Sequence, residues 1–117
     1  MTLKNTQLQD NDLQRFVEHS NKINGRVLSF TRFLMLTLLA YFQEGIQYRE
    51  LRVALKISDG KLVSNLRYLT KMGYVRKFLV NYDNKKLDVY ALTEEGKKEL
   101  ELVTEWLALA AKVAKGG

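Results

Sequence analysis

The segment SDGKLVSNLRYLTKMG, from Ser58 to Gly73, carries basic and hydrogen-bonding side chains at a spacing that would place them on one side of a helix. Its leucines recur at i, i+4 and i+7, so at about 100° per residue they form an apolar stripe. The other side is small, polar and basic, and it carries Gly60, Lys61, Ser64, Arg67, Tyr68 and Lys71. Such groups hydrogen-bond to base edges and phosphates, as a helix entering the major groove of DNA requires.

Both ends of this helix are predicted by capping residues. Ser58 stands at the N-cap position, where its hydroxyl would accept a hydrogen bond from a free amide of the first turn. Gly73 stands where helices commonly end in the left-handed conformation. The whole polar segment is therefore expected to be helical.

Three helices are expected before this segment. Residues 10–23 form an amphipathic helix that ends near Gly25. Residues 28–43 form a second helix, which is apolar on most of its circumference and is expected to be the most buried element. Tyr48–Leu55 forms a short third helix, and a tight turn at Lys56 joins it to the polar helix. Two short helices joined in this way, the second with a basic outer face, are typical of a helix-turn-helix.

After Gly73 the pattern changes to that of a β-hairpin. The stretches YVRKFLVNY and LDVYAL are rich in β-branched and aromatic residues, and DNKK separates them. Apolar residues fall on both sides of the first strand, so the pattern leaves open which face is buried. The hairpin is basic, with Arg76 and Lys77 in its first strand and Lys85 and Lys86 in its loop.

The expected C-terminal helix has more apolar residues than one face can hold. It begins at Thr93, a capping residue followed by acidic residues, and runs to about Ala114. Its apolar residues form two stripes roughly 140° apart, whereas a helix lying on its own domain needs only one. The second stripe is expected to form a homodimer interface through Leu102, Trp106, Leu109 and Val113. Alternatively, residues 1–23 of the same chain cover this helix.

Length and charge fit a single basic domain. The 117 residues are expected to form one unit, with a core at about 28–96 and dimerisation helices within 1–27 and 97–117. The formal net charge is +6, and residues 46–90 alone hold ten Lys and Arg against four Asp and Glu. In residues 1–45 and 91–117 the basic and acidic residues are nearly equal in number, so the excess positive charge lies in the segment that contains the polar helix. This distribution favours a polyanionic partner.

No catalytic site, metal site or cofactor site can be assembled from these residues. The chain has no Cys and a single His, His19, which excludes disulfides, thiolate metal sites and the usual metal sensors. No nucleophile, base and orienting group occur together, so an enzyme is not expected. The absence of Cys fits a cytoplasmic protein. The apolar run 27–42 is too short and too polar to cross a membrane, for which roughly 20 apolar residues are needed.

Residues 28–100 resemble the winged-helix transcriptional regulators related to the MarR and ArsR groups, especially their small archaeal members. The match consists of Arg32 within a long apolar helix, followed by YRELRVALKIS, SDGKLVSNLRYLTKMGYV and ALTEEGKKEL. The resemblance implies an α+β, mostly α fold: a winged helix-turn-helix with a two-stranded wing and N- and C-terminal dimerisation helices. Members often carry Gly where this chain has Lys56, so a different turn geometry is expected there.

The resemblance also implies roles for individual residues. Gly60 would let the helix N-terminus approach a phosphate closely. Arg67 would suit guanine and Asn65 adenine, although Asn65 could equally pack against the wing and Tyr68 could cover the edge of the core. MarR-type wings often end in Arg, so Lys85 and Lys86 are expected to lack its bidentate contact. Phosphate contacts are expected from Arg49, Arg52, Lys71, Arg76, Lys77, Asn84, Lys85 and Lys86.

These features together predict a dimeric, sequence-specific regulator of transcription that binds double-stranded DNA without a cofactor. Two alternatives stay open: a winged helix used as a protein-interaction module, and a protein that binds nucleic acid without sequence preference. The operator, the direction of regulation and any small effector cannot be deduced from the sequence.

Overall fold

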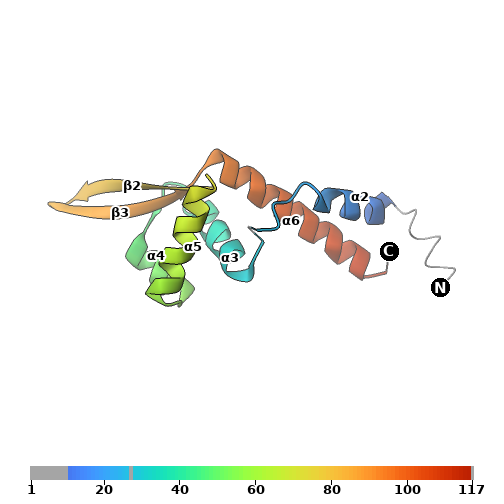
Figure 1. Cartoon of the computed structure of the whole chain (residues 1–117), viewed down its shortest axis with the longest axis horizontal. Coiled ribbons are helices and arrows are strands. Elements are labelled where there is room, and N and C mark those ends of the chain that lie inside the picture. Colours follow the sequence, from blue (N-terminus) through green and yellow to red (C-terminus); the bar gives the residue numbers. More distant parts are fainter. Residues whose placement is uncertain (1–10, 27, 117) are drawn as a thin grey trace.

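A computed structural model of the chain describes residues 11–26 and 28–116 (Figure 1). The elements are α2 (Asn11–Ser20), α3 (Phe30–Tyr41), β1 (Ile46–Gln47), α4 (Tyr48–Leu55), α5 (Asp59–Lys71), β2 (Val75–Tyr82), β3 (Lys85–Leu92) and α6 (Glu94–Ala114). Helices α3, α4 and α5 form a central body (Figure 1). The β2–β3 hairpin leaves this body at one end, and α2 and α6 leave it side by side at the other. The predicted winged helix-turn-helix is confirmed, with α4 and α5 as the two helices and the hairpin as the wing.

The predicted caps of α5 are confirmed. The hydroxyl of Ser58 accepts a hydrogen bond from the amide of Lys61 at 3.2 Å. At the other end Gly73 has a φ of +85°, and its amide donates to the carbonyl of Thr70. The next amide, of Tyr74, reaches back to the carbonyl of Leu69, which completes a Schellman motif. The helix is therefore fixed at both ends by local sequence.

The turn between α4 and α5 does not need a new geometry, so that expectation was wrong. Lys56 lies in the left-handed region, with φ 55° and ψ 43°, and its amide donates to the carbonyl of Arg52. This is the conformation that glycine would adopt there. A side chain in it costs roughly 1–2 kcal/mol, which the packing of the two helices on either side must offset.

The core forms where three helices meet the base of the sheet. Its fully buried side chains include Met35, Leu36, Leu39, Leu51, Leu62, Leu69 and Val75. Helix α3 was expected to be the most buried element, and its middle residues Met35, Leu36 and Leu39 are buried. Leu34 is nevertheless 40% exposed, and Phe30 and Tyr41 near the two ends are each 80% exposed.

A third strand that the sequence analysis missed joins the wing to the core. β1 pairs antiparallel with β3 through Ile46 and Tyr90, so the sheet has the order β1-β3-β2. Gly45 precedes it with a φ of +109°, and a Cβ there would lie 2.5 Å from Val89. Two residues carry too little pattern to predict a strand. Its effect is to fix the base of the wing against the body.

Burial in the wing changes along its length, which answers the open question about its faces. At the base, Val75 and residues 89–92 are buried. Toward the tip, Leu79 and Tyr82 are exposed even though they lie on opposite faces of β2. Asp83 and Asn84 both have positive φ, as a tight two-residue hairpin turn requires. Lys85 and Lys86 were expected in the hairpin loop, but they are the first two residues of β3.

Part of the second apolar stripe of α6 is covered within the same chain, as the alternative interpretation allowed, because Trp106 has a partner in α2. Its ring stacks on Phe16 of α2, with centroids 5.2 Å apart and planes 10° from parallel, and Leu109 is buried. Helix α2 therefore covers part of the second stripe. It ends at Ser20 and not near residue 23 as expected, while residue 10 lies outside the described residues. Leu102 and Val113 are half-buried. The arm made of α2 and α6 still exposes Val17 and Leu107.

No helix within the described ranges combines the length and the apolar character that a membrane span requires.

Candidate nucleic-acid interface

The outer surface of α5 presents most of the predicted contact residues to solvent. Lys61, Ser64, Arg67 and Lys71 are all exposed, while Leu62, Leu66 and Leu69 on the opposite side are buried. Gly60 has nothing within 4 Å of the position that a Cβ would occupy. Ser58 is exposed, but its hydroxyl is engaged in capping the helix. The polar side of α5 is therefore accessible along its length.

Asn65 and Tyr68 lie apart from this surface, because Arg32 of α3 engages both. The Arg32 Nε atom donates to Asn65 Oδ1 at 3.0 Å, and its guanidinium carbon lies 3.9 Å from the centre of the Tyr68 ring. Both residues are half-buried. The hydrogen bonds of Asn65 go to Arg32 and to the carbonyl of Lys61, and not to the wing that was considered as its alternative partner. In the sequence, Arg32 was noted only as part of a long apolar helix. Its contacts with α5 could not be predicted, because they depend on how α3 packs on α5.

Two arginines of α4 have different surroundings. Arg52 pairs with Asp59 in the first turn of α5, with 3.5 Å between Nε and Oδ1. The Tyr48 hydroxyl donates to the same carboxylate oxygen at 2.7 Å, and this hydrogen bond raises the pKa of Tyr48. Arg49 is exposed and carries no such pair among the contacts described. Sequence reasoning missed Asp59, an acidic group beside the N-terminus of the recognition helix.

A cleft of about 280 Å³ brings Arg49 together with both lysines of the wing tip. Lys85 and Lys86 line it from β3, and Gln47, Tyr48, Leu87 and Asp88 complete it. Residues nearly forty positions apart in the sequence therefore share one basic surface. Asn84 lies beside it at the exposed turn of the hairpin.

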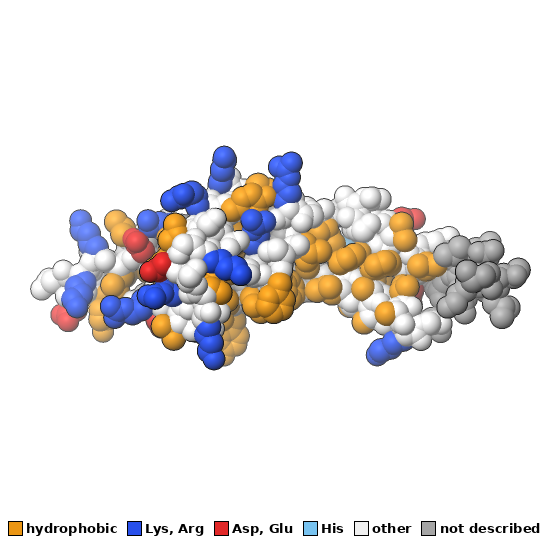
Figure 2. Space-filling model, turned by 60° about the horizontal axis from the view of Figure 1, so that its bottom comes forward, with side chains coloured by type: hydrophobic (Ala, Val, Ile, Leu, Met, Phe, Trp, Pro, Cys, Tyr) orange, Lys and Arg blue, Asp and Glu red, His pale blue; other side chains and the backbone are white. Residues whose placement is uncertain are grey.

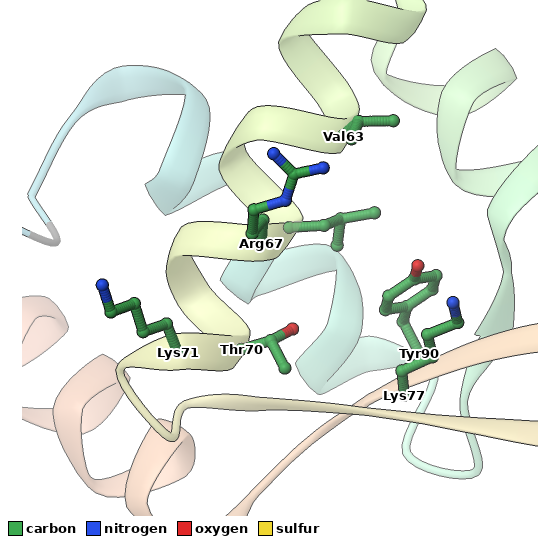
Figure 3. A pocket seen from close by; sticks show the side chains of 7 residues that line it. Val63, Arg67, Thr70, Lys71, Lys77 and Tyr90 are labelled. Carbon is green, nitrogen blue, oxygen red and sulfur yellow. The ribbon is translucent and has the colours of Figure 1, made fainter.

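A second groove, of about 410 Å³, lies between α5 and the base of the wing (Figure 3). Arg67 and Thr70 reach it from α5, and Lys77 and Tyr90 reach it from the strands (Figure 3). Lys71 also lines it, but its ammonium group points away from Lys77 and Tyr90 (Figure 3). Val63 and Leu66 complete its lining. Two cations, Arg67 and Lys77, beside the hydroxyl groups of Thr70 and Tyr90 suit an anion such as a phosphate.

Lys77 and Tyr90 also interact with groups close to this groove. Lys77 pairs with Asp88 at 3.7 Å. Burial raises the pKa of Tyr90, and the nearby Lys77 ammonium opposes that rise, so the hydroxyl is a neutral donor near pH 7. Thr70 could have been predicted as a groove residue, because it lies one helical turn from Arg67. Tyr90 could not, because its place opposite Lys77 depends on the register of the strands.

Arg76 does not join Lys77, although the two are adjacent in the sequence. Successive side chains in a strand point to opposite faces. Arg76 lies on the other face of the hairpin, with its guanidinium carbon 4.6 Å from the centre of the Phe78 ring. Only Lys77 faces α5.

Positive charge gathers on one half of the molecule. Figure 2 shows most Lys and Arg side chains over the wing and the neighbouring helices, whereas the α2–α6 half is mainly hydrophobic or uncharged on this face. Within residues 11–26 and 28–116, no three His, Asp or Glu side chains are placed to hold a metal ion. The arrangement is suited to binding an extended polyanion.

Comparison with known proteins places this surface in a family context. The family model described as a winged helix DNA-binding domain matches residues 31–110. No curated protein gives a significant match.

Solved structures of two protein–DNA complexes and of a further transcriptional regulator share the fold. The MepR–DNA complex of S. aureus is 18% identical, with 97% of this chain and 84% of that chain covered and a TM-score of 0.64. The transcriptional repressor CouR bound to a 23-mer DNA duplex is 21% identical, with 92% and 70% covered and a TM-score of 0.63. A transcriptional regulator from Clostridium thermocellum is 25% identical, with 71% and 87% covered and a TM-score of 0.54.

Proposed function

Because this chain belongs to the winged helix DNA-binding domain family, we propose that it is a cytoplasmic transcriptional regulator that binds specific sequences of double-stranded DNA as a homodimer. The observation that carries the proposal is the exposed polar side of α5, together with a basic groove between α5 and the wing and a basic cleft between α4 and the wing tip. In this arrangement α5 enters the major groove. The cations of α4 and the wing then contact the phosphates on either side.

Within this interface, base reading and phosphate binding fall to different residues. Lys61, Ser64 and Arg67 are exposed from the first turn to the middle of α5, on the side where a helix in the major groove meets base edges. Arg49, Lys85 and Lys86 share a cleft at the edge of this surface and bind phosphates, which position the protein without specifying sequence. Arg52 contributes less to phosphate binding, because Asp59 already pairs with it.

The α2–α6 arm is the proposed dimer interface. It leaves the body on the side opposite the wing (Figure 1). It exposes Val17 and Leu107, and Leu102 and Val113 on its second stripe are half-buried. Trp106 and Leu109 support this surface from within by holding α2 on α6. A two-fold dimer would set its two α5 helices about 34 Å apart, one helical turn of DNA.

Selection of bound sequences from a random duplex pool tests this function. We expect enrichment of a pseudo-palindrome whose half-sites are centred roughly 10 bp apart, because a two-fold dimer presents two copies of α5. No enriched motif, together with no gel shift of random duplex at micromolar protein and low salt, would favour the protein-interaction module. A shift without enrichment would favour binding of nucleic acid without sequence preference.

Replacing Arg67 should relax the sequence preference. We expect Arg67→Ala to cost about 1–3 kcal/mol on the selected duplex and much less on random duplex, since a bidentate contact to guanine is lost. Lys85→Ala is the matched control, because it also removes one exposed cation but should weaken binding to all sequences alike. Fluorescence anisotropy with both duplexes measures the two effects. A uniform loss in both variants would remove Arg67 from the base-reading residues.

A further inference from the structure

Arg32 connects three parts of the molecule through one guanidinium group. It lies in the first turn of α3, where its amide donates to the N-cap hydroxyl of Ser29 at 3.1 Å. Its side chain donates to Asn65 Oδ1 at 3.0 Å and to the carbonyl of Arg26, and it stacks on the Tyr68 ring. Asn65 and Tyr68 belong to α5, whereas Arg26 belongs to the segment that joins α2 to α3.

These contacts fix the orientation of Asn65. Its Oδ1 accepts from Arg32, and its Nδ2 donates to the carbonyl of Lys61 one turn earlier, at 2.8 Å. Both ends of the amide are thus engaged within the protein. The Tyr68 ring is held in the same way by the stacked guanidinium, since cations are attracted to an aromatic face.

The segment on the far side of Arg32 is itself anchored. The side chain of Asn24 accepts from the amide of Arg26 and donates to the hydroxyl of Tyr74. The backbone amide of Asn24 donates to the buried carboxylate of Glu99 on α6 at 3.0 Å. Arg32 therefore bridges the polar edge of α5 and a segment that is tied to the base of the arm.

We propose that Arg32 is a positioning residue for base recognition: it holds Asn65 and Tyr68 in place, so that the exposed residues of α5 meet the bases in one fixed orientation. The proposal rests on the proposed function, because it concerns how α5 reads DNA. Arg32 thereby sets the ratio between specific and non-specific affinity. It adds little to the affinity for phosphates, because part of its guanidinium is used inside the protein.

Only arginine can make this set of contacts. Its planar group stacks on a ring while donating in the plane to two oxygens, whereas the lysine ammonium is a point charge that cannot do both. Arg32→Lys should therefore keep the positive charge but restore only part of the function. This separates positioning from a simple electrostatic effect.

The test compares four variants on the duplex selected by the wild-type protein and on random duplex. They are Arg32→Ala, Arg32→Lys, Asn65→Ala and the double variant Arg32→Ala with Asn65→Ala. Arg26→Ala is the matched control, since it removes one exposed cation nearby but keeps the carbonyl that Arg32 contacts. Circular dichroism and thermal unfolding establish that each variant is folded. If Arg32→Ala does not fold, the ratio of specific to random affinity is compared between the wild type, Arg32→Lys and Asn65→Ala.

We expect Arg32→Ala to lower the ratio of specific to random affinity about tenfold, within the range of couplings between contacting residues. The double variant should lose little more than Arg32→Ala alone, because the two residues act as a unit. Arg32→Lys should have a ratio between those of the wild type and Arg32→Ala, and Arg26→Ala should leave the ratio unchanged.

Two results would overturn the inference. One is an equal loss on both duplexes with a smaller salt dependence, which would make Arg32 a phosphate contact. The other is an unchanged ratio in both Arg32 variants. A wild-type protein that selects no motif would instead contradict the proposed function itself, so the two failures are distinguishable.

Discussion

Raising the salt concentration from about 50 to 200 mM should weaken duplex binding by roughly 10⁴-fold, if a dimer neutralises about eight phosphates. Each phosphate contact releases condensed counterions, so log affinity should fall against log salt with a slope near −7. The exposed cations at the two grooves are sufficient in number, since each chain offers Arg49, Lys71, Lys85 and Lys86. Anisotropy titrations at several salt concentrations give this slope directly.

The wing tip should account for a defined part of that slope. Replacing both Lys85 and Lys86 by Ala removes four cations from a dimer, so the slope should become less steep by roughly 3 to 4. Lys97 and Lys98 on α6 are the matched control pair, because they are also exposed but pair with acids of their own helix. An equal change in slope for both pairs would mean that net charge alone attracts the DNA. A slope near zero for the wild type would contradict DNA binding.

The elements predicted best from the sequence are those specified by local chemistry. Helix α4 has the expected bounds, and α5 ends at Ser58 and Gly73 as the capping residues indicated. The hairpin turn at Asp83 and Asn84 was located for the same reason. In each case a side chain within a few residues determines the backbone, so the signal is present in the sequence itself.

Features that depend on packing between distant segments could not be predicted in the same way. The strand β1 exists because two residues meet the edge of β3, and the contact of Arg32 with Asn65 spans 33 positions. Lys56 takes the left-handed conformation despite its side chain, because the packed helices on both sides require it. Sequence periodicity shows which face of a helix is apolar but not which segment covers it, as Trp106 and Phe16 illustrate.

Gly96→Ala should destabilise the protein by about 1–3 kcal/mol, as overpacking of a well-packed site does. Helix propensity alone predicts the opposite, since Ala is favoured over Gly by roughly 1 kcal/mol in a helix. Gly96 lies in the first turn of α6, where an added Cβ would come 2.2 Å from the carbonyl oxygen of Tyr74. That oxygen cannot yield easily, because it accepts from the amide of Thr93. Urea unfolding followed by circular dichroism measures the change.

Gly60→Ala is the matched control, and it should stabilise the fold while weakening DNA binding. Gly60 lies in the first turn of α5 with nothing within 4 Å of an added Cβ, so Ala should stabilise the fold by about 0.5–1 kcal/mol. Its duplex affinity should nevertheless fall, because the new methyl group would stand between the helix N-terminus and the phosphate that its amides approach. If Gly60→Ala binds as tightly as the wild type, α5 does not bring its N-terminus to the DNA backbone. If Gly96→Ala is more stable than the wild type, the first turn of α6 does not pack against the carbonyl oxygen of Tyr74 as closely as this structure shows.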